Sequence, residues 1–532
     1  MSLQEMQSNI EHVVHLMFEN RGFDHLLGWL YDVNRQPKVH IPALRPGELE
    51  FYGIPHDAQL NPLPWLPGDA SFYEVGPEKY TGKRHHIHRG TWGYCYMPAC
   101  DPGEGWQDVG EQIFGPSWTE GKLGPPLDWQ MYGFYLNYQK QRFGVGSDRD
   151  ILATCTPEEL PVMHTLAESF AVSDMWFCSA PTQTNPNRAF SLGGSSQGRR
   201  DNCTFNGKPF DTLRTIFTVL GEQGHSWKLY ADHHWMLLEK LYFTQYLFPM
   251  GMEHGSFGSI GDFAADVAND ALPRFTYIEP AFFGEATWPP FGTDYHPPFK
   301  LKDGEWFLKK IYDILRTHPA VFEKTLFIVT FDEHGGTYDH LVPPTNAVRP
   351  SSEPYDLPFG RYGLRVPTLL ISPCVPAGCV FRAGYYPETP ETTPPHPYDH
   401  TSVLATLMKW LNIPYGDESS PGWLGARTAV APTFEEVIGP VQNTTWPDVK
   451  PFHCHDTWFG KEIPDELIPQ LIERISGFER GTAQHAELVT HVQSAPTERD
   501  AHRRLLQLRE MHGDRPRNGD LCCASATSVP SG

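Results

Sequence analysis

The stretch Leu326–His340, LFIVTFDEHGGTYDH, decides how the rest of the chain is interpreted. It begins with a run of apolar and β-branched residues, which is typical of a strand buried on both faces of a parallel sheet. The run ends at two consecutive acids, Asp332 and Glu333, followed by His334. Ligands of open α/β sheets bind beyond the carboxyl ends of the strands, and adjacent carboxylates repel unless a cation or a shared proton compensates them. We expect a ligand site here; capping of a following helix is the alternative.

A second strand is expected near the N-terminus and also ends on polar residues. The segment His12–Phe18 is followed directly by Glu19 and Asn20. Carboxylate and amide oxygens bind hard or borderline cations, so this pair is a second candidate for metal binding. The alternative is that Asn20 or Asp24 caps a helix.

Strand-like and helix-like segments alternate along the chain, which predicts a doubly wound, mainly parallel α/β sheet flanked by helices. The predicted strands are 12–18, 171–180, 226–231, 274–279, 326–331 and 366–373. The predicted helices are 158–170, 211–223, 262–272, 304–317, 403–412, 463–478 and 480–511, with a further helical pattern at 107–115.

The predicted organisation is one catalytic domain over residues 1–415, with a loop-rich insertion at 35–150. A C-terminal helical extension, 416–511, is expected to pack on that domain, and 512–532 to be a flexible tail.

The composition excludes several classes of protein. A net charge of −22 argues against nucleic acid and against adhesion to anionic membranes through a basic patch. It does not exclude an anionic substrate, because a bound metal ion can outweigh the distant field. No apolar run is long enough for a transmembrane helix, and the first residues lack the basic start of a signal peptide. The predicted location is cytoplasmic.

The segment Pro181–Arg188, PTQTNPNR, reads as a prolyl turn at a sheet edge. A hydroxyl on such a turn can be held exposed as a nucleophile, and Thr184 is the candidate. A threonine hydroxyl is weakly nucleophilic at its free pKa and needs a base or a metal ion. A purely structural turn is the alternative.

Elsewhere, His85, His86 and His88 form a histidine-rich loop, for which a solvated basic loop and a metal site are both open readings.

Several long motifs occur together in order over about residues 12–415. They are FENRGFDHLLGWL at 18–30, LAESFAVSDMWFCSAPTQTNPNR at 166–188, FDEHGGTYDHLVPP at 331–344, RVPTLLISP at 365–373 and YDHTSVLATLMKWLN at 398–412. Together they resemble the phosphoesterase family of bacterial and plant non-specific phospholipases C and related acid phosphatases. This family is a branch of the alkaline phosphatase superfamily, so the resemblance implies an alkaline phosphatase-like fold.

The resemblance also implies one bound divalent metal ion and a hydroxyl nucleophile. The family's metal ligands fall on Glu19, Asn20, Thr184, Asp332 and Glu333, and its nucleophile falls on Thr184. Metal-assisted attack by that hydroxyl would give a phospho-threonine intermediate, which water then hydrolyses.

Two further roles are implied by position in the motifs, and two positions depart from them. The first histidine of the family's HPP motif, which contacts the phosphoryl group, is His296, and we expect His334 and Asn20 to line the same substrate site. The family turn DPGH reads DPGE here, with Glu104 in place of histidine, and Phe299 replaces a second histidine after HPP. Glu104 would then act as an acid of raised pKa or bind a cation, or face a positively charged substrate group. A histidine of the 85–88 loop is a possible replacement imidazole.

The sequence thus predicts a metal-dependent, phospholipase C-like phosphoesterase that acts on a small-molecule or lipid phosphoester. One alternative is a catalytically impaired homologue that still binds phosphate or metal, which the change at Glu104 motivates. Another is a hydrolase or transferase of a special phosphonate or sulfate metabolite.

Overall fold

A computed structural model describes most of the chain. The described residues are 2–32, 34–54, 74–75, 78–79, 87–91, 97–115, 118, 131, 133–141, 150–202, 213–232, 256–281, 292–298, 300–345, 347–350, 360–383, 396–450 and 483–493.

One large sheet organises the described part of the chain. Its nine strands, from one edge to the other, are β2 (Val39–Ile41), β13 (Cys379–Phe381), β7 (Ala171–Ser173), β12 (Thr368–Ile371), β11 (Thr325–Phe331), β1 (His12–Phe18), β10 (Phe275–Glu279), β8 (Trp227–Ala231) and β9 (Phe257–Ser259). Two short pairs lie apart from it: β3 (Glu74–Val75) with β4 (Glu78–Lys79), and β5 (His88–Arg89) with β6 (Ala153–Thr154).

The register of the central strands determines which residues meet at the sheet's carboxyl edge. β1 pairs in parallel with both β10 and β11, and Phe18 is the partner of Phe331. The residues that follow, Glu19 and Asp332, therefore leave adjacent strands side by side. β12 runs antiparallel to β11 and to β7, whereas the other pairs in the sheet are parallel. The predicted mainly parallel α/β sheet is confirmed.

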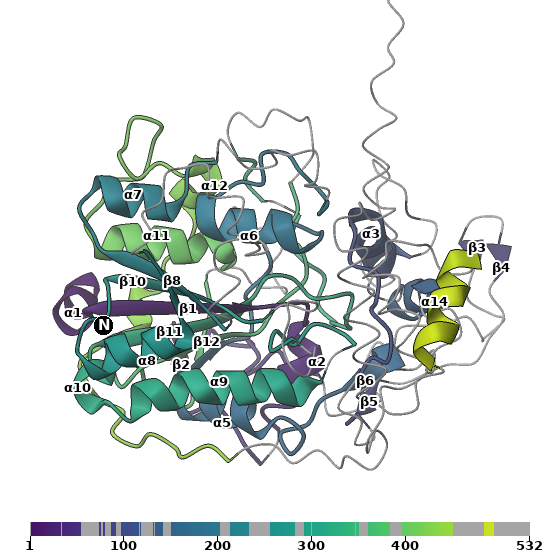
Figure 1. Ribbon diagram of the computed structural model, residues 1–532, viewed down its shortest axis with the longest axis horizontal. Coiled ribbons are helices and arrows are strands. Elements are labelled where there is room, and N and C mark those ends of the chain that lie inside the picture. The colour runs from purple at the N-terminus through teal and green to yellow at the C-terminus, as the bar shows by residue number, and fades with distance from the viewer. Residues whose placement is uncertain are drawn as a thin grey trace, which may run out of the picture.

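Helices cover both faces of the sheet. α6, α7 and α11 lie on one side, and α5 and α9 lie on the other (Figure 1). The helices of the described residues are α1 (Leu3–Asn9), α2 (Phe23–Leu27), α3 (Trp106–Phe114), α4 (Phe134–Gln141), α5 (Pro161–Ser169), α6 (Thr184–Gly193), α7 (Ile216–Glu222), α8 (Ile260–Ala268), α9 (Leu301–Arg316), α10 (Pro319–Phe322), α11 (His400–Trp410), α12 (Gly425–Val430) and α14 (Ala483–Gln493). Short 3-10 turns occur at η2 (Asp150–Leu152) and η6 (Glu435–Val437).

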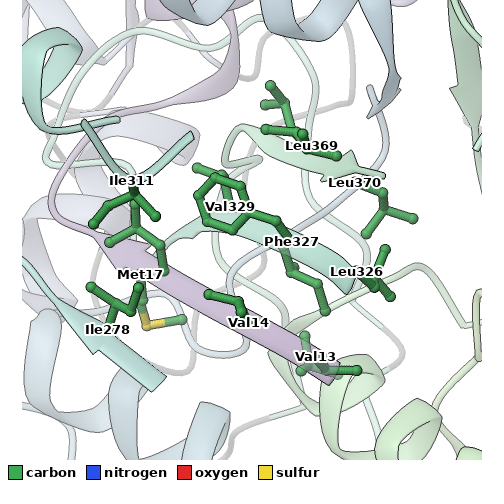
Figure 2. Close-up of a cluster of buried hydrophobic side chains, with 14 of the residues drawn as sticks. Val13, Val14, Met17, Ile278, Ile311, Leu326, Phe327, Val329, Leu369 and Leu370 are labelled. Carbon is green, nitrogen blue, oxygen red and sulfur yellow. The ribbon is translucent and has the colours of Figure 1, made fainter. Parts of the chain in front are cut away.

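The hydrophobic core lies between the sheet and these helices. β1 and β11 are buried along their whole length, because helices cover both of their faces. Figure 2 shows side chains of β1, β10, β11, β12 and α9 packed together, among them Val14, Ile278, Phe327 and Leu369. Burying each such side chain contributes roughly 1.5–3 kcal/mol to stability. The rigid sheet therefore fixes the positions of the polar residues that follow its strands.

Three local predictions were wrong in extent or type. The strand expected over 171–180 is paired in the sheet only as β7, and the chain beyond it makes isolated bridges at Trp176 and Phe177. The turn expected at 181–188 becomes helix α6 from Thr184 onward. The helix expected at 403–412 begins earlier than predicted, at His400, with Asp399 as its N-cap.

The C-terminal part is described in pieces. Phe434, Val437, Ile438 and Val449 belong to the same buried cluster as the sheet. The structure describes part of the predicted helix 480–511, as α14. The predicted helix 463–478 and the predicted tail 512–532 lie outside the described residues. No helix in the described ranges combines the length and the apolar character needed to span a bilayer.

Candidate functional site

The N-terminus of α6 brings Thr184 to the carboxyl edge of the sheet. Helix α6 starts at Thr184, and Pro186 lies in its first turn, where a missing backbone N–H costs nothing. Thr184 is almost fully buried, and its Oγ1 donates to Asn20 Oδ1 over 3.3 Å. The positive end of the helix dipole favours anions at this position, such as a phosphate group or an alkoxide.

Asn20 connects the strand ends. Its backbone is left-handed, with φ 57°, and its N–H donates to Asp332 Oδ1 over 3.0 Å. Its carbonyl oxygen packs against Gly335, where an added Cβ would lie only 2.0 Å from that oxygen. Gly335 itself has φ 61°, a conformation that glycine adopts without strain. Glycine is thus required at position 335 by the close approach of the two strand ends.

Both carboxylate oxygens of Asp332 and its carbonyl oxygen make hydrogen bonds. Oδ1 also accepts from the backbone N–H of Glu333, and Oδ2 accepts from Arg188 Nε over 3.2 Å. The Asp332 carbonyl lies 2.6 Å from His400 Nε2. Burial raises the pKa of Asp332, and Arg188 opposes that rise.

Arg188 is a residue of the candidate site that sequence reasoning missed. It lies one turn after Thr184 on α6 and is fully buried among acids from three strand ends. Its guanidinium nitrogens lie 3.9 Å from Glu19 and 3.8 Å from Glu279. Burial alone would lower its pKa, but these neighbours raise it overall. Recognition of α6 as a helix would have found it, because residues four apart share a face.

Glu333 is a buried acid with other acids close to it. It is fully buried; Oε2 accepts from Gly335 N over 2.7 Å, while Oε1 has no hydrogen-bond partner among the described residues. Burial raises its pKa well above the usual range, and Glu104, Asp332 and Glu19 raise it further. A buried carboxylate oxygen without a donor, beside other carboxylates, suits a bound cation.

His334 faces protein atoms through both ring nitrogens. Nε2 lies 2.8 Å from Gln112 Oε1, and Nδ1 lies 3.1 Å from Glu333 Oε2. Burial lowers its pKa to about 3, so the ring is neutral. Its expected contact with substrate stays a prediction.

Glu104 and His296 meet at the side chain of Asn20. Asn20 Nδ2 donates to Glu104 Oε2 in a short hydrogen bond and lies 2.8 Å from His296 Nε2. His296 Nδ1 lies 3.7 Å from Asp101 Oδ1. Asp101, Glu104 and His296 each offer a ligand atom within 4.8 Å of the others, so they form a possible metal-binding group.

A second such group has a different character. Asp24, Asp339 and His340 also bring ligand atoms within 4.8 Å of one another. Arg365 already bridges the two acids, at 2.9 Å from Asp24 and 3.0 Å from Asp339. This cluster is a buried ion-pair network. It joins Asp24 on α2, the helix after β1, to Asp339, His340 and Arg365.

Some of the predicted site residues contact one another directly, and others are connected only through a third residue. Asn20 touches Thr184, Asp332, Glu104 and His296, whereas Glu19 meets Asp332 through Arg188. In the described part of the chain, Glu19, Asp332 and Glu333 do not form a third group of the compact kind described above. His88 contacts Gly90 O beside the small β5–β6 pair, and His85 and His86 lie outside the described residues.

Comparisons with known proteins were made on the whole chain. Residues 10–414 match the Phosphoesterase family. Non-specific phospholipase C4 of Arabidopsis thaliana is 31% identical over 81% of this chain and 72% of its own length. Non-hemolytic phospholipase C of Burkholderia pseudomallei is 24% identical over 76% of this chain and 56% of its own length. A solved alkaline phosphatase superfamily protein from Vibrio parahaemolyticus gives a TM-score of 0.30 at 15% identity, covering 53% of this chain and 66% of that chain. The family match runs from β1 to α11 and contains every candidate site residue.

Proposed function

Because this chain belongs to the Phosphoesterase family, as its motifs predicted, we propose that it hydrolyses a phosphate ester in a phospholipase C-type reaction through Thr184. The observation that carries the proposal is the placement of the Thr184 hydroxyl. It lies at the N-terminus of α6 and donates to Asn20, whose backbone in turn binds Asp332. A hydroxyl held at a helix N-terminus beside buried acids suits attack on a phosphoryl group.

The acids and the amide that follow β1 and β11 suit a divalent cation. Glu19, Asn20, Thr184, Asp332 and Glu333 together offer oxygen atoms, the donors that hard cations prefer. The unpartnered Oε1 of buried Glu333 supports this assignment. A bound cation would offset the carboxylate charge, lower the pKa of the Thr184 hydroxyl and stabilise charge on the transferring phosphoryl group.

The proposed reaction has two balanced steps. Thr184 Oγ1 forms a bond to phosphorus while the bond from phosphorus to the leaving alcohol breaks, and one proton passes from the hydroxyl to that alcohol. Water then attacks the phospho-threonine, which restores the hydroxyl and releases the phosphorylated product. We assign the exchange of this proton to His296, whose Nε2 lies 2.8 Å from Asn20 Nδ2; such a role is typically worth about 10²–10⁴-fold in rate.

Turnover and covalent trapping test the proposal together. The substrates are p-nitrophenyl phosphate and p-nitrophenyl phosphorylcholine, each with and without a chelator. We expect chelation to stop turnover, Thr184→Ala to lose at least about 1,000-fold in kcat, and Thr184→Ser to keep measurable activity. Rapid quenching of wild type should show phosphate on the peptide that contains Thr184.

Full, chelator-sensitive activity in Thr184→Ala would remove Thr184 from the nucleophile role. Tight binding of a phosphate ester without turnover would instead favour the impaired, phosphate-binding alternative.

A further inference from the structure

Asn20 has little conformational freedom except at its side-chain amide. The backbone N–H is bonded to Asp332, and the carbonyl oxygen is pressed against Gly335. The amide still has two orientations related by a half turn, and they exchange an acceptor, Oδ1, for a double donor, Nδ2. Only the orientation with Oδ1 toward Thr184 can accept from its hydroxyl or offer an oxygen to a cation.

The two groups on the other side of the amide select one orientation. His296 Nδ1 lies 2.5 Å from Pro297 O, and a carbonyl only accepts, so Nδ1 carries the proton. His296 Nε2 is therefore an acceptor, and it receives one N–H of Asn20. Glu104 Oε2 receives another. After a half turn, Oδ1 would face a carboxylate and an imidazole lone pair, a repulsive arrangement without any donor.

Glu104 differs from His296 in that it has no donor at all when ionised. A neutral side chain of the same shape, such as glutamine, could donate to a turned Oδ1 and would tolerate both orientations. The contact with Asn20 also explains why a carboxylate stands at position 104, and it requires no direct role of Glu104 in the reaction. It joins the 101–105 loop, which leads into α3, to the end of β1.

We propose that Glu104 is a positioning residue that holds the Asn20 amide with Oδ1 toward Thr184. The inference rests on the proposed function, because Thr184 is the group whose environment it sets. It assigns Glu104 a contact with Asn20 rather than with substrate, and so predicts an effect on kcat and on cation affinity rather than on KM.

The test compares Glu104→Gln with Glu104→Asp and with a matched control. Glu111→Gln removes a carboxylate on α3 that contacts Asn137 and Lys140 instead of Asn20. We expect Glu104→Gln to lower kcat about 10–100-fold with KM within about threefold of wild type. Mn²⁺ affinity, measured by calorimetry without substrate, should fall by a similar factor. Glu104→Asp should recover part of both losses, and Glu111→Gln should match wild type.

Two results would overturn the inference. One is a Glu104→Gln variant with wild-type kcat and Mn²⁺ affinity. The other is a rise in KM at unchanged kcat, which would place Glu104 on the substrate. Thr184→Ala, assayed in parallel, separates the two proposals: an active Thr184→Ala defeats the nucleophile assignment, whereas an inactive Thr184→Ala beside an unaffected Glu104→Gln defeats only the role of Glu104. The calorimetric readout holds even where no substrate is turned over.

Discussion

Arg188 Nε donates to Asp332 Oδ2 across 3.2 Å, and neither side chain is exposed to solvent. The same guanidinium also donates to the carbonyl of Phe18, the last residue of β1. One cation on α6 thus joins the ends of two central strands to the helix that carries Thr184. A charge buried this deeply is tolerated because several acids surround it.

Removal of Arg188 should therefore be strongly destabilising. Arg188→Ala leaves buried carboxylates without their partner, and we expect a loss of about 3–5 kcal/mol in the free energy of unfolding. Arg188→Lys keeps the charge but lacks the planar fork, so its loss should be smaller. Urea unfolding measures both, and an Arg188→Ala loss below about 1 kcal/mol, the value of an exposed ion pair, would contradict this reading.

Gly335 is expected to resist even the smallest substitution. In Gly335→Ala the new Cβ would meet Asn20 O at 2.0 Å, and the φ of 61° is unfavourable for alanine by roughly 1–2 kcal/mol. We expect lower stability and at least about tenfold lower kcat, because Asn20 must move. Gly416→Ala is the control, since no atom of the described residues lies within 4 Å of the added atom. Equal behaviour of the two variants would show that the close approach is unimportant.

Glu333 should be costly to stability unless a cation is bound. Burial raises its pKa, so at neutral pH its ionisation opposes folding. In the presence of chelator, Glu333→Gln should melt at the same temperature as wild type or higher. Saturating Mn²⁺ should stabilise wild type, by about 2.7 kcal/mol at 100 times Kd, and leave Glu333→Gln nearly unchanged. Equal Mn²⁺ stabilisation of both proteins would remove Glu333 from the cation site.

Buried histidines should make the protein acid-sensitive. Burial lowers the pKa of His15, His164 and His334 to about 3 and that of His400 to about 4. Below about pH 6.5 these four histidines take up protons in the unfolded chain but not in the folded protein. Stability is therefore complete above pH 6.5 and is lost as the pH falls toward 3–4, by up to about 1.4 kcal/mol per pH unit for each histidine.

His164→Gln isolates one such group. His164 Nε2 lies 2.8 Å from Leu26 O, and a glutamine amide can donate in its place. Between pH 6.5 and pH 5, wild type should lose about 2 kcal/mol more than the variant in urea unfolding. Burial raises the pKa of Glu305 to about 7, so this acid makes stability rise as the pH falls, the opposite of the histidines. Because Glu305 is present in both proteins, its contribution cancels in the comparison. Identical losses would show that His164 titrates normally in the fold.

Local sequence located six of the nine strands of the sheet and the kinds of residue at its edge, but not the three-residue strands β2, β9 and β13. The apolar runs of β1 and β11 are buried on both faces, so hydrophobic pattern alone located them, and the acids and amide after them were visible as polar ends. The same local pattern failed at 184–193, because Pro186 and its asparagine neighbours resemble a turn, and a helix readily accepts a proline only in its first turn. It failed again beyond Ser173, where buried residues are irregular rather than paired in a strand.

Only the tertiary structure decided which of these groups touch. Asn20 and Asp332 are separated by 312 positions, and they meet because β1 and β11 pair in register, with Phe18 opposite Phe331. The contacts of Arg188 with the strand ends, and of Glu104 with the Asn20 amide, depend on where α6 and the 101–105 loop pack. Residue type fixes what a side chain can donate or accept, but its partner is set by long-range packing, which no local pattern encodes.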